Sequence, residues 1–557
     1  MQIDQGARRR PVSPALMRSR ARLRLAGFVL VGLLCVLGLR LIVLMGFAPD
    51  RGEGARIAAQ VAAKPRAPIV DRNGEVLALS VPVMSAYADP SLMIDPRGAL
   101  EKLITILPDL APRKARLDTA FRDDGRKFLW LKRHLSMEEQ DALQAAKIEG
   151  IGFRQEYQRR WPKGRLAAHV VGLTDIDGKG LEGLELSRND RLVDSETPLQ
   201  LTMDIRLQHK VRDALADMIE MRTAKSGSAL VLDAETSGVL ASVSLPDFDP
   251  VDRGVEGRFN ANVQGVYEMG STFKLFNTAL ALDQGYTPQD GYKLTPAIRV
   301  GRFTIRDYHP HPGFHSIADI LRVSSNVGSI HMVRAAGKEA QRDFMGRLGM
   351  LKSIPGLELG GAGRPGVPSP WRDISAVTIA YGYGLSVTPL HLVAATGALV
   401  NGGNWCAPRY TDEGMADEAR CNPVLTDTQS EQMRRMMRYV VEAGTGKAAD
   451  VPGMLVGGKT GTTEIGYASV EGGKAVRASF IAAFPMHKPR YIVYAMIEDP
   501  QKLEGELRRP TGGKAAAPVV GEIIKAIASL NALPEKDRAA PDIAAALDLD
   551  LPKAGGH

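Results

Sequence analysis

The sequence predicts an α+β protein with one membrane-spanning helix near its N-terminus. Residues 25–48, LAGFVLVGLLCVLGLRLIVLMGFA, form an apolar run long enough to cross a bilayer as a single helix, which needs about 20 residues. In residues 199–532, strand-like segments stand at both ends and helical segments lie between them. We therefore expect one large α+β domain whose sheet is completed by strands that are distant in the sequence.

The basic residues are concentrated in front of the apolar run. Residues 1–24 contain seven arginines and one acid, Asp4, while the whole chain of 557 residues has a net charge of +8. Arginines on this side predict a cytoplasmic N-terminus and an uncleaved anchor; the alternative, a cleaved signal peptide, would have a shorter apolar run. Without a nucleic-acid-binding motif, we expect no nucleic-acid partner. Arg40, inside the run, either reaches the far interface or contacts a partner membrane protein.

The chain has three cysteines, one of which, Cys35, lies in the apolar run. Cys406 and Cys421 flank a polar segment that would lie outside the cytoplasm, where disulfides persist. The two residues either form a disulfide, worth about 3 kcal/mol in the chain-entropy model, or remain free thiols.

Residues 60–198 contain no nucleophile or paired-carboxylate pattern, which favours a noncatalytic role for them. The turn Asp71-Arg72-Asn73-Gly74 between two β-prone runs predicts a hairpin, because Asn-Gly adopts positive φ at little cost. Residues 96–147 are charged and amphipathic and should be mostly helical. Residues 159–185 are rich in glycine and turns.

The region 199–532 opens with an amphipathic helix, DIRLQHKVRDALADMIEM, residues 204–221. Two strands joined at Thr236-Ser237-Gly238 are predicted in GSALVLDAETSGVLASVS, residues 227–244. A second pair of strands is predicted in ASFIAAFP and RYIVYAMIED, residues 478–499.

A serine and a lysine stand three residues apart in YEMGSTFKLF, residues 267–276. On a helix, Ser271 and Lys274 would share a face. A neutral lysine can take the proton that makes a serine hydroxyl nucleophilic, and both burial and a second cation favour the neutral form. Taken alone, however, the pattern is better explained by a serine that caps a buried helix.

Two further patterns lie downstream. Ser324-Ser325-Asn326 is a Ser-x-Asn pattern, and GGKTGTT, residues 457–463, contains Lys-Thr-Gly, where glycine on a strand edge would let a ligand backbone approach. Each pattern is weak by itself. Their order along the chain, Ser-x-x-Lys, Ser-x-Asn and then Lys-Thr-Gly, is the signature of penicillin-interacting serine enzymes and favours the catalytic interpretation of Ser271.

With these motifs, the chain resembles a class B penicillin-binding protein of the division-specific type, penicillin-binding protein 3. The resemblance covers nearly the whole chain and rests on DRNG, AAHVVGLTDIDGKGLEGLE, YEMGSTFK, SSNVG, YGYGLSVTPLHL and GGKTGTT. It implies an elongated pedestal domain and a transpeptidase domain in which an antiparallel β-sheet is flanked by helices and joined by an α-helical subdomain. One departure is Met269, where the family usually has a proline that would preset the turn into the helix.

The residue patterns and the resemblance together predict a division of the chain and a location. We expect a basic cytoplasmic tail, a transmembrane anchor, a noncatalytic pedestal of the dimerisation type, a transpeptidase domain and a flexible C-terminal tail, at residues 1–24, 25–48, 49–198, 199–532 and 533–557. The chain would be embedded in the bacterial inner membrane with its catalytic domain in the periplasm at the division site. Its expected partners are a polytopic membrane glycosyltransferase and other division proteins.

The first two motifs would carry out acylation. By resemblance, Ser271 attacks the penultimate D-alanine of a peptidoglycan stem peptide ending in D-Ala-D-Ala, or a β-lactam, and forms an acyl-enzyme. Lys274 accepts the serine proton. Ser324 relays a proton to the leaving D-alanine, and Asn326 binds the stem amide and orients Lys274.

The third motif would bind the substrate. By resemblance, Lys459 is the second cation near Lys274, and the terminal carboxylate of the substrate is held by the segment Lys459, Thr460, Gly461 and Thr462. The backbone N–H groups of Ser271 and Thr462 form the oxyanion hole. The mechanism requires no metal and no cofactor.

Other functions stay open at this stage. An elongation-type transpeptidase, or a D,D-carboxypeptidase or β-lactamase, would use the same motifs, and a noncatalytic β-lactam sensor or wall-binding scaffold would use acylation only as a signal. The histidines of YHPHPGFHS, at positions 309, 311 and 315, are candidate zinc ligands or, alternatively, part of a loop at the rim of the site.

Overall fold

The computed structural model describes Gly32, Leu33, Val36 and residues 64–252, 254, 256–413, 421–469 and 473–549. These residues belong to two compact units, Met1–Lys64 and Pro65–His557. The predicted tail at residues 1–24 and, apart from three residues, the predicted anchor at residues 25–48 with Arg40 lie outside the described residues. Among those that are described, no helix is both long and apolar enough to span a membrane.

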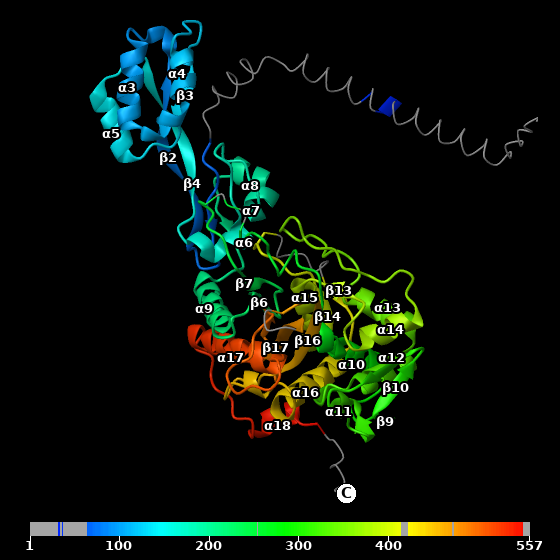
Figure 1. Ribbon diagram of the computed structural model, residues 1–557. Coiled ribbons are helices and arrows are strands. Elements are labelled where there is room, and N and C mark those ends of the chain that lie inside the picture. The colour runs from blue at the N-terminus through cyan, green and yellow to red at the C-terminus, as the bar shows by residue number, and fades with distance from the viewer. Residues whose placement is uncertain are drawn as a thin grey trace, which may run out of the picture. The chain divides into compact units, whose positions relative to one another are not determined.

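A five-stranded sheet opens the second unit (Figure 1). Its order is β3-β2-β1-β5, and β4 also pairs with β2. The predicted hairpin turn is confirmed: Gly74 has a φ of +87° and donates its N–H to the carbonyl oxygen of Asp71 at 3.1 Å. The strands are β1 (Ile69–Val70), β2 (Val76–Ala88), β3 (Leu129–Lys132), β4 (Ile151–Arg160) and β5 (Leu199–Gln200).

Three helices pack around the end of β2 that pairs with β3. Their buried residues, Leu100, Leu103 and Phe121 among them, share a core with Ala86 and Leu131 from the strands. Residues 96–147 are therefore mostly helical, as expected, although β3 is a strand that the amphipathic pattern did not indicate. The helices are α3 (Pro96–Ile106), α4 (Lys114–Phe121) and α5 (Met137–Ala146).

A buried glutamate joins two distant arginines in this part of the chain. The carboxylate of Glu185 is fully buried and accepts hydrogen bonds from Arg66 Nε at 2.9 Å and from Arg159 Nε at 2.7 Å. Burial of a charge is tolerated only with such partners. Three short helices lie in and just after the glycine-rich segment: α6 (Ala168–Val171), α7 (Gly183–Ser187), which carries the glutamate, and α8 (Asn189–Asp194).

The second large sheet is antiparallel and has the order β16-β17-β18-β6-β7. The two predicted strand pairs lie side by side in it, because β18 pairs with β6 from Tyr491 opposite Asp233 to Glu498 opposite Ser226. The prediction of a sheet completed by distant strands is confirmed. The strands are β6 (Ser226–Asp233), β7 (Val239–Leu245), β16 (Gly457–Ala468), β17 (Lys474–Phe484) and β18 (Tyr491–Glu498).

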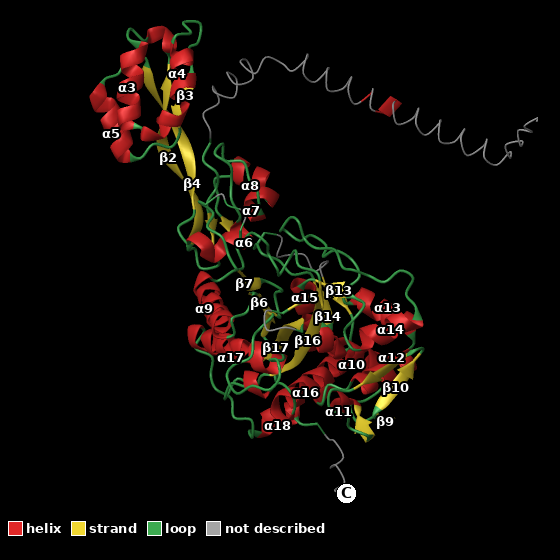
Figure 2. Ribbon diagram, in the orientation of Figure 1, coloured by secondary structure: helices red, strands yellow, loops and turns green. Residues whose placement is uncertain are grey.

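Helices cover both faces of this sheet (Figure 2). Side chains alternate between the two faces of a strand, so Ala229 and Val231 of β6 share a core with α9 and α17, whereas Leu230 and Leu232 share one with α10, α15 and α16. The middle of β6 is therefore buried on both faces and is apolar from Ala229 to Leu232. The helices are α9 (Ile205–Met221), α10 (Lys274–Asp283), α15 (Pro389–Val400), α16 (Asp427–Ala443) and α17 (Gly512–Leu530).

A mostly helical region lies in the chain between β7 and β16, as the resemblance implied. Its further helices are α11 (Ile317–Arg322), α12 (Asn326–Ala336), α13 (Lys338–Arg347) and α14 (Asp373–Ala380). Short antiparallel pairs accompany them: β8 (Tyr267–Glu268) with β13 (Ser386–Val387), β9 (Gly291–Leu294) with β12 (Gly313–Ser316), and β10 (Ala297–Val300) with β11 (Phe303–Arg306).

Cys406 and Cys421 form a disulfide. They stand opposite each other in the antiparallel pair β14 (Asn404–Cys406) and β15 (Cys421–Pro423). This pairing is the first of the two alternatives that the sequence left open.

The segment expected to be a flexible C-terminal tail, 533–557, instead contains a packed helix, α18 (Pro541–Leu547). Its apolar residues Ile543 and Leu547, four positions apart, are buried in the same core as α16. Arg538 also donates to Glu442 of α16 at 2.7 Å. The Ala- and Asp-rich composition concealed this short amphipathic pattern. Residues 550–557 lie outside the described residues.

Candidate active site

Ser271 lies in a 3-10 turn, Gly270–Phe273, that leads into α10. The side chain of Ser271 is half-buried, and Lys274, the first residue of α10, is fully buried. Ser271 and Lys274 therefore do not lie on the one continuous α-helix that we expected. Ser271 lies in a tight turn, and Lys274 begins the helix that follows it. Ser271 does not cap α10, whose first turn follows directly from the 3-10 turn.

Two glycines let this turn pack directly against β16. A Cβ atom on Gly270 would lie 2.9 Å from the carbonyl oxygen of Thr462, and one on Gly461 would lie 2.9 Å from the carbonyl oxygen of Met269. Both positions are too tight for a side chain. Gly461, which we expected to admit a ligand backbone, thus brings the Lys-Thr-Gly strand against the turn that carries Ser271.

Met269, in the place of the expected proline, is part of the core. It is 3% exposed, and its sulfur accepts a weak hydrogen bond from the hydroxyl of Tyr494 at 3.8 Å. Its carbonyl oxygen accepts from Thr272 Oγ1 at 2.7 Å, and the Gly270 N–H donates to Gly382 at 3.1 Å. Tertiary contacts therefore hold the turn that a proline ring would have preset.

The Ser-x-Asn motif lies at the N-terminus of α12. Ser324 has a φ of +59°, a left-handed conformation that is uncommon for a residue with a side chain. Asn326 is the first residue of α12, and its side-chain amide donates to the carbonyl oxygen of Arg306 at 2.9 Å. That bond identifies the amide nitrogen, so the amide oxygen of Asn326 points to the other side.

This oxygen, Oδ1, accepts a hydrogen bond from Lys274 Nζ at 2.7 Å. Lys274 Nζ also donates to the carbonyl oxygen of Ser324 at 2.5 Å and lies 3.2 Å from Ser324 Oγ. Two of these three neighbours, the carbonyl oxygen of Ser324 and Oδ1 of Asn326, can only accept hydrogen bonds. A neutral amine has two N–H groups for them, which leaves its lone pair for the third neighbour, the Ser324 hydroxyl.

Lys459 approaches the same serine from β16. Its Nζ donates to Ser324 Oγ at 2.9 Å, and it is fully buried. Burial, opposed by the charge of Asp307, lowers the pKa of Lys274 to about 7. Burial and the charge of Lys274 lower the pKa of Lys459 well below its usual value. The two lysines share one hydroxyl, so a negative ligand beside them would favour the charged form of either.

The Lys-Thr-Gly strand is an edge strand, since β16 stands at the end of the sheet order, beside β17. Its outer edge is available to hydrogen-bond an extended peptide. Thr460 and Thr445 hydroxyls are 2.9 Å apart, and Thr462 Oγ1 accepts from the Gly512 N–H at 3.1 Å. Because the Thr462 oxygen is already an acceptor there, its hydroxyl proton remains available for an anionic ligand.

The three histidines of the YHPHPGFHS segment do not converge. The ring of His309 packs on Tyr308, and the ring centres of His311 and His315 are 6.0 Å apart. In the part of the chain that the structure describes, no group of three or more His, Cys, Asp or Glu residues is arranged to hold a metal ion.

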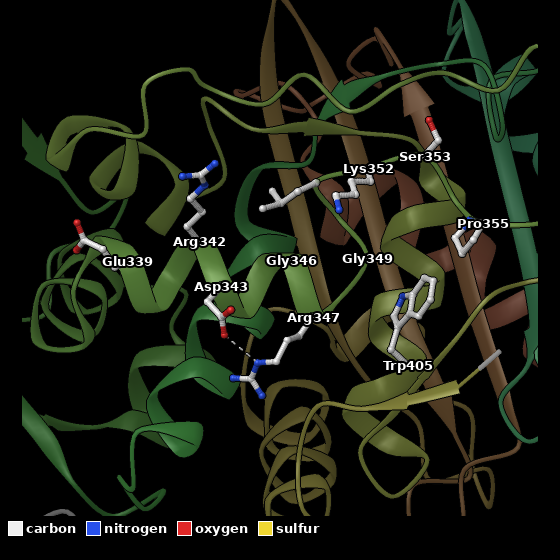
Figure 3. Close-up of a pocket in the computed structure, with 11 residues that line it drawn as sticks. Glu339, Arg342, Asp343, Gly346, Arg347, Gly349, Lys352, Ser353, Pro355 and Trp405 are labelled. Atoms are coloured by element: carbon white, nitrogen blue, oxygen red, sulfur yellow. Dashed lines mark hydrogen bonds and ion pairs between the residues drawn. The ribbon is translucent and has the colours of Figure 1, made fainter. Parts of the chain in front are cut away.

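A cavity of about 730 Å³ lies away from the three motifs (Figure 3). It is lined by residues of α13, among them Arg342 and Arg347, and by Trp405 of β14. Arg347 is already paired with Asp343 at 3.2 Å. The cavity contains no residue of the three motifs and is separate from the candidate active site.

Several residues that contact the motifs were not predicted from the sequence, among them Arg306, Asp307, Thr445 and Gly512. None of them belongs to a recognisable pattern. The only signal in the sequence for Asp307 was its position just before the histidine-rich segment, and the histidines of that segment suggested a zinc site instead.

The chain matches two protein families along most of its length. Residues 227–525 match the penicillin-binding protein transpeptidase domain, and residues 61–193 match the penicillin-binding protein dimerisation domain. The chain belongs to the penicillin-binding protein transpeptidases. The three motifs of this family, which are far apart in the sequence, are the residues that meet around Ser324.

Curated members of the family extend over most of this chain. It is 33% identical to the "Probable peptidoglycan D,D-transpeptidase FtsI" of Caulobacter vibrioides, covering 83% of this chain and 81% of the relative. It is 29% identical to the peptidoglycan D,D-transpeptidase FtsI of Escherichia coli, covering 90% of both chains. Penicillin-binding protein 3 of Mycobacterium tuberculosis, solved with aztreonam, shares the fold at 24% identity with a TM-score of 0.65, covering 86% of this chain and 98% of that structure.

Proposed function

We propose that the protein is a serine D,D-transpeptidase that crosslinks peptidoglycan stem peptides in septal wall synthesis, and that β-lactams acylate the same serine. One observation supports this proposal most strongly. Lys274 of the first motif and Lys459 of the third both contact Ser324 of the second, at 3.2 and 2.9 Å, beside the turn that carries Ser271. A structural cap on a buried helix would not need a second buried lysine.

Acylation begins with proton transfer. Neutral Lys274 takes the proton of Ser271, whose Oγ forms a bond to the carbonyl carbon of the penultimate D-alanine. The negative charge on the carbonyl oxygen is stabilised by the backbone N–H groups of Ser271 and Thr462, each worth about 3 kcal/mol. The C–N bond then breaks, and the nitrogen of the leaving D-alanine receives a proton through Ser324.

The terminal carboxylate of the stem peptide brings a negative charge next to the two buried lysines. Lys459, Thr460 and Thr462 hold it at the outer edge of β16, and Gly461 keeps this edge close to Ser271. Since the carboxylate favours a charged Lys459, it also favours a neutral Lys274 through repulsion between the two ammonium groups. Substrate binding thereby prepares the base.

The amine of a neighbouring strand resolves the acyl-enzyme. It attacks the ester carbonyl, its N–C bond forms as the C–Oγ bond breaks, and Ser271 regains a proton. A D,D-carboxypeptidase or β-lactamase would use water in this step.

The setting of this reaction is part of the proposal. The apolar run at residues 25–48 anchors the chain in the inner membrane with its N-terminus in the cytoplasm, and the transpeptidase acts in the periplasm at the division site. A polytopic membrane glycosyltransferase, together with other division proteins, supplies the glycan strands, because residues 60–198 carry no catalytic pattern of their own.

Labelling with a fluorescent penicillin tests the nucleophile. We expect covalent labelling of the wild type and none of Ser271→Ala. The control is Ser91→Ala, at an exposed serine in the short turn that follows β2, and it should label like the wild type. Equal labelling of wild type and Ser271→Ala would refute the assignment.

The acceptor is tested by following a D-Ala-D-Ala stem peptide with and without an amine acceptor. A crosslinked product that depends on the amine supports transpeptidation. Release of D-alanine with only hydrolysed product would show a carboxypeptidase.

A further inference from the structure

Asp307 follows β11 directly and reaches the Ser-x-Asn motif from a separate segment of the chain. Its Oδ1 accepts from the backbone N–H of Asn326, through a short contact, and from that of Val327 at 3.0 Å. Its Oδ2 accepts from Ser325 Oγ at 2.7 Å. One carboxylate thus binds three consecutive residues of the segment that contacts Lys274.

These bonds complete the N-terminus of α12. The first N–H groups of a helix have no partner within the helix. Asp307 takes those of Asn326 and Val327, and Ser325, which Asp307 holds, accepts from Gly328 at 2.9 Å. A carboxylate is also favoured at a helix N-terminus by the helix dipole.

The same segment provides the two obligate acceptors of Lys274. They are the carbonyl oxygen of Ser324 and Oδ1 of Asn326, at 2.5 and 2.7 Å. Ser324 holds the unusual φ of +59° immediately before the residues that Asp307 binds. Arg306, next to Asp307, accepts from the Asn326 side chain and so orients its oxygen toward Lys274.

We propose that Asp307 is a positioning residue for acylation: it binds the backbone of Asn326 and Val327 and the hydroxyl of Ser325, and thereby holds the two acceptors that aim the Lys274 amine at Ser271. Asp307 does not touch the reacting atoms. The inference rests on the proposed function, because acylation of Ser271 is its readout.

The carboxylate has a second effect through its charge. Among the described residues, the charged groups that act on this site are Asp307, after β11, and the two lysines, Lys274 of α10 and Lys459 of β16. Asp307 raises the pKa of Lys274 against the larger effect of burial. Removal of the charge alone should therefore lower the pKa of Lys274, and the amine should be neutral at lower pH.

Two substitutions separate geometry from charge. Asp307→Asn keeps an oxygen for the N–H groups of Asn326 and Val327 but removes the charge. Asp307→Ala removes both. Asp204→Ala is the matched control, since Asp204 caps α9 with a side chain that accepts from the Arg206 N–H and lies outside the three motifs.

The experiment measures the second-order rate constant for acylation by a fluorescent penicillin across pH, together with the melting temperature of each variant. Asp307→Ala should lose about 10²-fold in rate, the scale of a 1 Å misplacement of reacting groups. Asp307→Asn should recover most of this loss, and the acid limb of its pH profile should move to lower pH. Asp204→Ala should acylate like the wild type even if its melting temperature falls.

The outcomes that overturn the proposal differ from a failure of the proposed function. If the wild type is not labelled at Ser271, the proposed function fails. If the wild type is labelled, the positioning role is wrong when Asp307→Ala acylates within threefold of it. It is equally wrong when Asp307→Asn, shown to be folded by its melting temperature, neither regains acylation rate relative to Asp307→Ala nor shifts the acid limb of its pH profile. Should Asp307→Ala not fold, the pH profile of Asp307→Asn decides.

Discussion

Lys274 and Lys459 approach the same oxygen, Oγ of Ser324, at 3.2 and 2.9 Å, although 185 residues separate them in the sequence. Both lysines are fully buried. Burial and the repulsion between two ammonium groups in one site both favour neutral forms of these lysines. The proposed function requires a neutral base of this kind for its serine nucleophile.

The acylation rate should rise with pH through about 7, because burial lowers the pKa of Lys274 to about 7 and only the neutral amine can take the Ser271 proton. Stopped-flow acylation by a fluorescent penicillin across the acid and neutral range measures this dependence. A rate that stays flat through neutral pH and rises only near the usual lysine pKa of about 10.4 would contradict it.

Substitution of Gly461 by alanine should disturb both stability and acylation. The added Cβ would lie 2.5 Å from Ser479 Oγ and 2.9 Å from the carbonyl oxygen of Met269, so the turn that carries Ser271 must move. We expect a loss of about 1–3 kcal/mol in the free energy of unfolding, typical of overpacking, and a marked loss of acylation rate.

The control for Gly461→Ala is Gly466→Ala in the same strand, where an added Cβ meets no atom within 4 Å. Denaturant unfolding and penicillin labelling of both variants give the comparison. Equal behaviour of the two would show that the close packing of β16 on the turn is unimportant.

Glu185→Gln should destabilise the part of the protein around the first five-stranded sheet. The substitution leaves the buried charges of Arg66 and Arg159 without their carboxylate, and loss of one partner in such a site costs about 3–5 kcal/mol. Glu522→Gln is the comparison, because the ion pair of Glu522 with Lys525 is exposed and worth about 0–1 kcal/mol. Thermal unfolding distinguishes them; similar melting temperatures would argue against a structural role for the buried cluster.

Replacement of both Cys406 and Cys421 by serine should lower the free energy of unfolding by about 3 kcal/mol, since the disulfide closes a loop with a sequence separation of 15. Reductant should destabilise the wild type similarly and leave the double variant unchanged. Peptide mapping without reductant checks the bond itself, and two free thiols in that map would disprove it.

Local patterns were sufficient to predict many elements. The short apolar runs of β6 and β7, the helical periodicity of α9 and the Asn-Gly turn before β2 depend on neighbouring residues, so they are visible in the sequence. In contrast, β3 and α18 were missed because each is short and is stabilised by partners elsewhere in the chain, such as β2 for β3 and α16 for α18.

The sequence by itself determined the three motifs and their order, because each consists of residues adjacent in the chain, and the order alone favoured a serine enzyme. Only the tertiary structure decided how those motifs work together. It brought Lys459 to Ser324, oriented the amide of Asn326 through Arg306, and placed Asp307 at the start of α12. The protonation of a lysine depends on its burial and on nearby charges, and both arise only when distant segments pack together.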